Sequence, residues 1–181
     1  MSQPTPTYLG LDLETTGLDP EHDLILEIGV LILGDDLTEI TRFDAPIAHE
    51  THAIMTRIND YVRDMHTQNG LLSELDAGKG IPLEQSEQTL HLIIDAYPER
   101  PVLLGSSVHF DRGFLRVHMP RIVERLSHRH CDASSFAMFA PQLRAHGGAA
   151  HRALADVRHS AQMCRDARAM LRRMPPRKAG R

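Results

Sequence analysis

The sequence predicts a single α/β domain in which an initial meander of strands is followed by helices and short strands. The first observation is an alternation in residues 8–18, which read YLGLDLETTGL. The second is a nearly continuous apolar run at 24–33, LILEIGVLIL, which indicates a core strand. The third is a helical repeat of apolar residues over 154–171. With 181 residues, 41% of them hydrophobic, the chain is long enough to bury one sizeable core.

The first strand carries two acids on one face. Because side chains alternate across a strand, Asp12 and Glu14 point to the same side, away from the three leucines. Gly17 permits the turn that ends this strand. Neighbouring carboxylates repel each other unless a cation lies between them, and Mg²⁺ or Mn²⁺ suits such oxygen ligands. The alternative is a solvated acidic edge strand.

Two more strands complete the predicted meander. Asp35 and Asp36 form the turn after the apolar run, and residues 37–47 form the third strand. Glu27 lies inside the apolar run, so it is either a buried acid near the metal site or a side chain facing outward at a strand edge.

The middle of the chain predicts helices. Residues 49–80 are polar and favour short helices, one of which begins after an N-cap at Asn59 or Asp60 and ends at Gly70. A longer helix follows Pro82. Its apolar face comprises Leu83, Leu90, Ile94 and Tyr97.

The last part predicts the remaining short strands and two main helices. Residues 102–104 form a strand, and Asp111 opens a helix that Pro120 ends. Residues 129–132 are expected to form the last strand, and residues 141–150, which contain Gly147 and Gly148, a mobile loop before the final helix. We expect one domain over residues 1–172 and a basic, disordered tail over residues 173–181.

Composition narrows the class of protein. The net charge of −4 combines a net of −14 in residues 1–100 with +10 in residues 101–181. An acidic half can hold metals and a basic half can meet phosphates, unless folding interleaves the two halves. The overall acidic charge argues against tight wrapping of long nucleic acid. There is no apolar run of membrane-spanning length and no signal-peptide pattern, and two cysteines without metal-ligand spacing fit a cytoplasmic setting.

Two further motifs bring polar residues to the first strand. GSSVHFDRGFL places Asp111 where a strand end meets a helix start, and HRALADV places His151 and Asp156 around the start of the last helix. Residues five apart on a helix point about 140° away from each other. His151 and Asp156 can therefore face one site only if His151 lies on the loop before the regular helix.

The segments DLETTGL, HFDRGFL and HRALAD resemble the three signatures of the DEDDh exonucleases, in order and at the usual separations. The resemblance implies an RNase H-like fold with a mixed five-stranded sheet flanked by helices, and metal-dependent removal of nucleotides from the 3′ end. It assigns two divalent metal ions, Mg²⁺ or Mn²⁺, to Asp12, Glu14, Asp111 and Asp156, and the role of general base to His151. Histidine suits that role because it titrates near neutral pH.

Within this superfamily the chain is most similar to the oligoribonucleases, which degrade very short RNA to mononucleotides. The segments NDYVRDMHTQNGLL, PLEQSEQTLHLII and RHCDASS carry this resemblance. It implies a homodimer and a preference for dinucleotides, with Leu18 against the bases and Tyr61 and His66 at the terminal nucleotide. It also implies a 5′-phosphate site, formed by Ser107, Arg129 and Ser134.

Other interpretations of these side chains stay open. Leu18 could be ordinary core, Tyr61 and His66 a surface helix face, and Ser134 a helix cap. The sequence also departs from the family pattern. Thr15 stands where methionine is usual, Tyr61 replaces a tryptophan, and His128 replaces the aromatic residue supplied across the dimer.

The functional alternatives are another DEDDh exonuclease, for proofreading or RNA trimming, and a non-catalytic nucleic-acid-binding module on the same fold. The intact set of four acids and a histidine argues against the non-catalytic module. Activity on long single strands would indicate the other exonucleases, but an aromatic content of 4% offers few platforms for stacking such strands.

Overall fold

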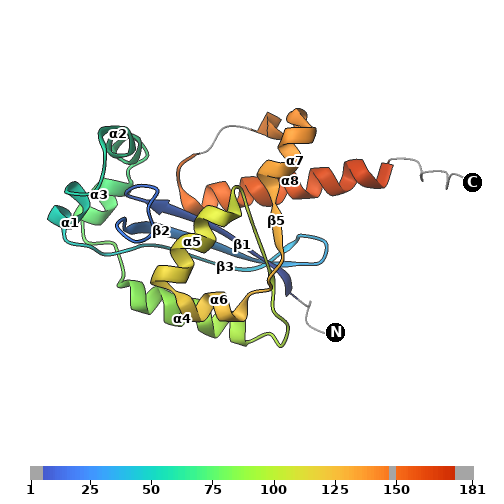
Figure 1. The fold of residues 1–181 in the computed structure, drawn as a ribbon, viewed down its shortest axis with the longest axis horizontal. Coiled ribbons are helices and arrows are strands. Elements are labelled where there is room, and N and C mark those ends of the chain that lie inside the picture. The colour runs from blue at the N-terminus through green and yellow to red at the C-terminus, as the bar shows by residue number, and fades with distance from the viewer. Residues whose placement is uncertain (1–5, 147–149, 174–181) are drawn as a thin grey trace, which may run out of the picture.

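A computed structural model describes residues 6–146 and 150–173 of the chain. Its centre is a five-stranded sheet with the strand order β3-β2-β1-β4-β5 (Figure 1). The strands are β1 (Pro6–Thr15), β2 (Ile25–Gly34), β3 (Glu39–Pro46), β4 (Val102–Gly105) and β5 (His130–Asp132). The first three strands pair antiparallel, and β1, β4 and β5 pair parallel. The predicted meander and the mixed five-stranded sheet are confirmed.

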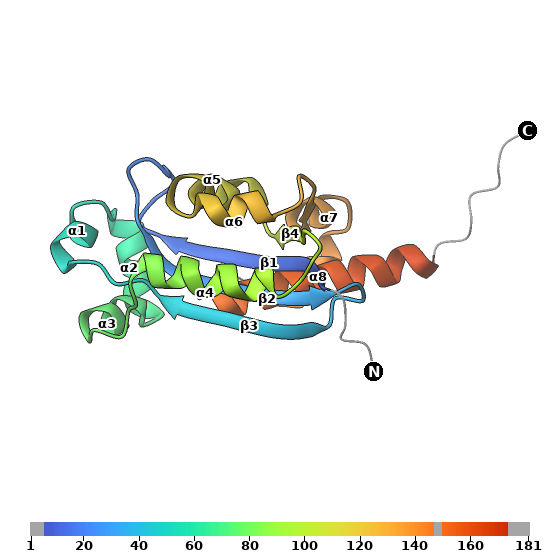
Figure 2. The same ribbon diagram turned by 90° about the horizontal axis from the view of Figure 1, so that it is seen from below.

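The helices cover both faces and one end of the sheet. Their bounds are α1 (Thr51–Met55), α2 (Asp60–Gln68), α3 (Leu71–Asp76), α4 (Leu83–Asp95), α5 (Val108–His118), α6 (Pro120–Arg125), α7 (Ala133–Phe139) and α8 (Ala153–Arg173). Helices α4, α5 and α6 pack on one face, and α7 and α8 pack on the other (Figure 2). Helices α1, α2 and α3 gather at the end of the sheet toward which β1 points (Figures 1 and 2). No helix in the described residues is long and apolar enough to cross a membrane.

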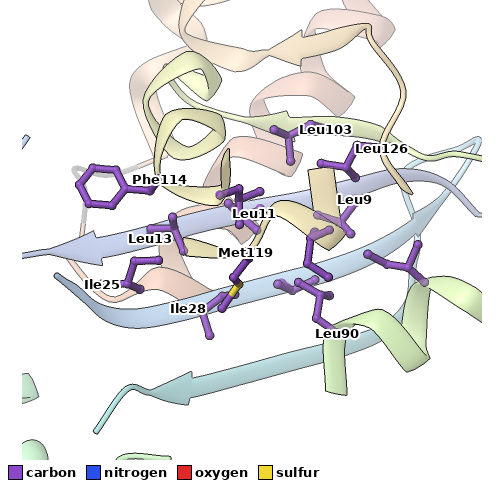
Figure 3. Packing of buried hydrophobic residues seen from close by; sticks show 14 of the residues in the cluster. Leu9, Leu11, Leu13, Ile25, Ile28, Leu90, Leu103, Phe114, Met119 and Leu126 are labelled. Carbon is purple, nitrogen blue, oxygen red and sulfur yellow. The ribbon is translucent and has the colours of Figure 1, made fainter. Parts of the chain in front are cut away.

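The alternation in β1 separates the core from the acidic face. Leu9, Leu11 and Leu13 are buried and pack toward Phe114 of α5 and Met119, as Figure 3 shows. Every residue of β2 is buried, because both faces of this inner strand are covered. The leucine face therefore anchors β1, and the opposite face is left for Asp12 and Glu14.

Two glycines let α8 lie directly on the acidic face of the sheet. A Cβ atom on Gly29 would lie 2.4 Å from the carbonyl carbon of Ala153, and one on Gly10 would lie 2.9 Å from Cγ2 of Val157. Gly29 stands opposite Asp12 in the β1–β2 ladder. The close approach therefore brings the first turn of α8 next to the acids of β1.

The structure differs from the sequence-based expectation in three places. Helix α5 begins at Val108, not at Asp111, because the carboxylate of Asp132, at the end of the neighbouring strand β5, accepts the backbone N–H groups of Ser107 and Val108. The stretch expected to be a mobile loop contains a 3₁₀ helix, Pro141–His146. Arg173, expected to begin the disordered tail, is the last residue of α8. The Gly147–Gly148 pair and residues 174–181 of the expected tail lie outside the described residues.

Candidate active site

Asp12 and Glu14 lie on the face of β1 that α8 covers. Glu14 stands opposite Glu27 of β2, so two acids share this part of the ladder, and Glu14 is buried. Burial, followed by the charges of Asp156 and Glu27, raises the pKa of Glu14 to about 8. Burial and then the neighbouring charges of Asp111 and Glu14 raise the pKa of Asp12 well above its usual range.

Asp111 reaches this site from the first turn of α5. Its Oδ1 atom accepts the backbone N–H of Leu13 at 3.1 Å, which ties the start of α5 to β1. Burial raises the pKa of Asp111 to about 7, although the hydrogen bond from Leu13 opposes that shift. A buried carboxylate is stable in its charged form only when it is paired, so a cation beside Asp111 would be favourable.

Asp156 and His151 come to the site from the start of α8. His151 precedes the helix, as expected, and has a left-handed backbone with φ of 51°. The carboxylate of Asp156 accepts the N–H of Ala150 at 2.7 Å and that of His151 at 2.9 Å. Asp156 therefore folds the loop back over the first turn of α8, which directs both side chains to one place.

The assembled side chains form a donor set for a divalent metal ion. One ligand atom each from Glu14, His151 and Asp156 lie within 4.8 Å of one another. Asp12 and Asp111 belong to the same cluster, because the charge of Asp111 adds to the burial that raises the pKa values of Asp12 and Glu14. Carboxylate oxygens are ligands that Mg²⁺ and Mn²⁺ favour, and a cation would offset the repulsion within the cluster. The residues present therefore fit divalent metal binding.

His66 lies beside this cluster, deep in the protein. It is 0% exposed, and its Nε2 is 3.6 Å from Oε2 of Glu14. Burial lowers the pKa of His66 to about 4, so the imidazole is neutral at pH 7. The interpretation of His66 as a surface side chain is therefore wrong.

Tyr61 lies on the open side of the same region. It is 74% exposed on α2. A pocket of about 630 Å³ runs between α2 and the loop before α8, and both Tyr61 and His151 line it. This pocket gives a nucleotide-sized group access to His151.

Leu18 is presented by the loop between β1 and β2. Its side chain is 82% exposed, so Leu18 is not part of the core. Asp23 organises this loop, since its carboxylate accepts the hydroxyl of Thr16 at 2.8 Å and the N–H of Asp19 at 2.9 Å. The loop is therefore held by its own hydrogen bonds, with an apolar side chain at its surface.

Two of the three residues expected to form a phosphate site, Ser107 and Ser134, meet around Asp132. Its Oδ1 accepts the N–H of Ser107 at 3.1 Å, and the N–H and hydroxyl of Ser134 at 2.9 and 2.7 Å. Asp132 is the N-cap of α7, so Ser134 is not the capping residue. Ser107, Arg129 and His128 are exposed. Ser107 and Ser134 are thus brought together, but the Ser134 hydroxyl donates to Asp132.

Sequence reasoning missed a hydrogen-bonded group behind His151. Arg152 pairs with Glu27, which proves to be a buried acid near the site and not an outward-facing one. Asn69, at the end of α2, donates from its side-chain amide to the carbonyl of His151. The signals available were an acid inside an apolar strand and an arginine directly after the histidine of the third motif.

Comparisons with solved structures identify the fold. Exonuclease I from Methylocaldum szegediense superposes with a TM-score of 0.65 at 17% identity, and covers 92% of this chain and 41% of its own. Escherichia coli exonuclease I, in a complex with a 5cy-dT13 oligonucleotide, gives a TM-score of 0.66 at 16% identity over 93% of this chain and 42% of its own. The chain thus spans about two-fifths of the length of these proteins and shares the RNase H-like fold with them.

Sequence comparisons identify the family. The family model described as Exonuclease matches residues 9–164. The oligoribonuclease of Corynebacterium diphtheriae is 36% identical over 157 residues, which are 81% of this chain and 74% of that protein. The oligoribonuclease of Pseudomonas aeruginosa PAO1 is 32% identical over 157 residues, 83% of this chain and 87% of that protein. Together with the acids and histidine that converge on the end of β1, these matches mean that the chain belongs to the oligoribonuclease family of exonucleases.

Proposed function

We propose that this protein is a 3′–5′ exoribonuclease that degrades short oligoribonucleotides, with dinucleotides favoured, to nucleoside 5′-monophosphates. The observation that carries this proposal is the convergence of Glu14, His151 and Asp156 within 4.8 Å, next to an open pocket. The oligoribonuclease relatives support the substrate class.

In the proposed mechanism Asp12, Glu14, Asp111 and Asp156 hold two divalent ions, Mg²⁺ or Mn²⁺. When bound, such ions stabilise the attacking and leaving oxygens of an in-line displacement at phosphorus. His151 takes the proton of the attacking water at an imidazole nitrogen. The place of His151 supports this role, because a ring nitrogen lies within 4.8 Å of carboxylate oxygens of Glu14 and Asp156.

The proposed substrate contacts lie on two sides of the metal site. Tyr61, which lines the pocket, receives the 3′-terminal nucleotide, and the exposed Leu18 packs against the bases. His66 is 0% exposed and lies 3.6 Å from Glu14, so its part in binding that nucleotide is exerted from behind Glu14. Ser107, Arg129 and Ser134 receive the 5′ phosphate of the shortest substrates. For this contact the Ser134 hydroxyl has to exchange Asp132 for the phosphate, whereas the exposed Arg129 can approach it directly.

A length series of RNAs tests the function. If the 5′ phosphate is capped, a 5′-phosphorylated dinucleotide is cut fastest and the rate falls with each added nucleotide, because a longer chain cannot place a terminal phosphate in the cap. Arg129→Ala should flatten this series by slowing the dinucleotide most, whereas Arg63→Ala, an exposed arginine paired with Asp60 on α2, should leave its slope unchanged.

A wild-type rate that stays level or rises from two to seven nucleotides contradicts the oligoribonuclease function. That result would leave the second candidate, a general DEDDh exonuclease, which the likeness to exonuclease I favours. No hydrolysis of any RNA or DNA length with either metal would leave the non-catalytic binding module.

We also propose a domain organisation, a cellular location and an oligomeric state for this enzyme. It acts as one catalytic domain over residues 1–172, in the cytoplasm, and as a homodimer in which His128 of one subunit reaches the substrate of the other. The family match over residues 9–164 supports the single domain, and the exposure of His128 supports the contact. Light scattering that finds a fully active monomer would contradict the dimer.

A further inference from the structure

The backbone of His151 is held in an unusual conformation from both sides. Its φ of 51° lies in the left-handed region, which a residue with a Cβ atom enters only when its surroundings compensate the strain. The N–H of His151 donates to Asp156 at 2.9 Å, and its carbonyl accepts the side-chain amide of Asn69. Both polar backbone atoms of the histidine are therefore bound by side chains.

Arg152, the next residue, is held by hydrogen bonds to two acids. The guanidinium of Arg152 donates to Glu27 from Nε at 3.0 Å and from Nη2 at 2.7 Å. The same Nη2 donates to Glu74 of α3 at 2.8 Å. The second oxygen of Glu27 accepts the N–H of Ala153 at 2.8 Å. Glu27 thus binds both the side chain before α8 and the first N–H of the helix.

This arrangement connects the His151 loop to the strand pair that carries the acids. Glu27 is 4% exposed and stands opposite Glu14 in the β1–β2 ladder. The Arg152 side chain is 32% exposed, whereas that of Glu27 is 5% exposed. Several charge-assisted hydrogen bonds to one guanidinium restrict its geometry, and removal of Arg152 would leave the charge of the buried Glu27 uncompensated. The position of His151 relative to Glu14 is therefore set through Arg152 and Glu27.

We propose that Arg152, together with Glu27 and Asn69, forms a positioning clamp that holds the His151 imidazole at the reacting end of the site. The inference rests on the proposed function, in which His151 is the general base. The physical reason is that proton transfer requires close contact, and a displacement of about 1 Å can lower the rate by roughly 100-fold. Asn69 lines the pocket beside Tyr61 and His151, whereas Arg152 and Glu27 do not line it. Arg152 and Glu27 therefore act on the rate through the placement of His151.

The first test is steady-state kinetics of Arg152→Gln on the 5′-phosphorylated diadenylate pApA with Mn²⁺. The kcat should fall by roughly 10- to 100-fold, whereas KM and the Mn²⁺ concentration for half-maximal activity should stay within about threefold. The control is Arg125→Gln, which removes a similar fork between α6 and α4, with Nε 2.6 Å from Asp95 and Nη2 3.2 Å from the Tyr97 carbonyl. That variant should keep its kcat. Equal kcat losses in both variants would overturn the proposal.

Arg152→Lys separates geometry from charge, because lysine keeps the positive charge but not the planar fork. The clamp predicts that kcat stays low in this variant. Recovery of the wild-type kcat would mean that Arg152 only balances the acidic charge, which overturns the positioning role. If Arg152→Gln does not fold, Glu27→Gln provides the same test, since its amide oxygen can still accept the N–H of Ala153.

The decisive test uses a variant that lacks the base. His151→Ala should lower kcat by roughly 10²- to 10⁴-fold, and Arg152→Gln added to it should cause no further loss, because the clamp then has no base to place. A further loss by the same factor as in the wild-type background overturns the clamp. Full activity of His151→Ala alone would instead contradict the proposed general base, so the two failures are distinguishable.

Discussion

The individual carboxyl groups of this site lie in surroundings that disfavour the ionised form. Asp111 and Glu14 are buried, and the pKa of each is raised to about 7 and about 8 respectively. In their ionised form these carboxyl groups do not stabilise the metal-free fold, because burial and mutual repulsion both oppose ionisation. The same burial and repulsion make the binding of a cation strongly favourable, and a nuclease of this kind needs cations at the scissile phosphate.

At the scale of single residues, Asp12→Asn is expected to abolish hydrolysis and to raise the melting temperature of the metal-free protein. The amide removes a buried charge from a repulsive cluster, which stabilises the fold, but it is a poorer metal ligand. Activity assays with Mg²⁺ and Mn²⁺ and thermal melts in EDTA measure the two effects. Glu124→Gln, an exposed acid on α6, serves as the control for loss of one negative charge.

Near-wild-type activity of Asp12→Asn with either metal would contradict its assignment as a ligand. A metal titration of His151→Ala that shifts as much as that of Asp12→Asn would show that His151 is itself a ligand, which its place within 4.8 Å of Glu14 and Asp156 permits.

At the scale of elements, the contact between β2 and α8 places the histidine loop. The contact depends on the absence of a side chain at Gly29, where a Cβ atom would lie 2.4 Å from the backbone at both Ala153 and Leu154. Because these neighbours are backbone atoms, they cannot move aside as a flexible side chain could. The start of α8 would have to move away from the strand pair.

Gly29→Ala should therefore destabilise the protein by roughly 1–3 kcal/mol and lower kcat by displacing His151. Chemical denaturation and kinetics on pApA measure both effects. Gly113→Ala is the matched control, since a Cβ there meets only Cγ of Pro20 at 3.8 Å, within a helix. That control should be neutral or stabilising by up to about 1 kcal/mol. Equal stability of the two variants would mean that the close contact does not hold α8 in place.

The elements that the sequence predicts well are those with a local pattern. Alternating leucines identify β1, and the five-residue spacing of His151 and Asp156 requires the histidine to precede α8, as it does. The start of α5 was misplaced because its first N–H groups are bound by Asp132, which is remote in sequence. The pairing of Glu27 with Arg152 spans 125 residues, so no local pattern could predict it.

At the scale of the whole molecule, folding joins the acidic and basic halves of the chain. Ion pairs link acids of the first half to arginines of the second: Glu27 to Arg152, Asp35 to Arg168, Glu39 to Arg158 and Asp95 to Arg125. For these groups, folding therefore brings the acidic first half and the basic second half together, so that their opposite charges partly cancel. The acids of the site are the exception, because Arg152 is engaged by Glu27 and Glu74 and only partly offsets their repulsion.

This uncompensated charge predicts how the stability of the metal-free protein depends on pH. A carboxyl group whose pKa is higher in the folded than in the unfolded state binds protons on folding. Its stabilising contribution is complete below the unfolded pKa and is lost as pH rises through the folded pKa. For Glu14 this window extends from 4.5 to about 8, and Asp12 and Asp111 shift in the same direction.

The melting temperature in EDTA should therefore fall by several degrees between pH 5.5 and 8.5. Mn²⁺ should raise it, and more at pH 8.5 than at pH 5.5, because the metal replaces the protons that the cluster holds at lower pH. Glu14→Gln should flatten the decline in EDTA, since it removes one group that must ionise, whereas Glu124→Gln should leave the slope unchanged. A metal-free protein whose stability rises over this range would mean that the acids are already compensated by the protein, and the cluster would then have no need of a cation.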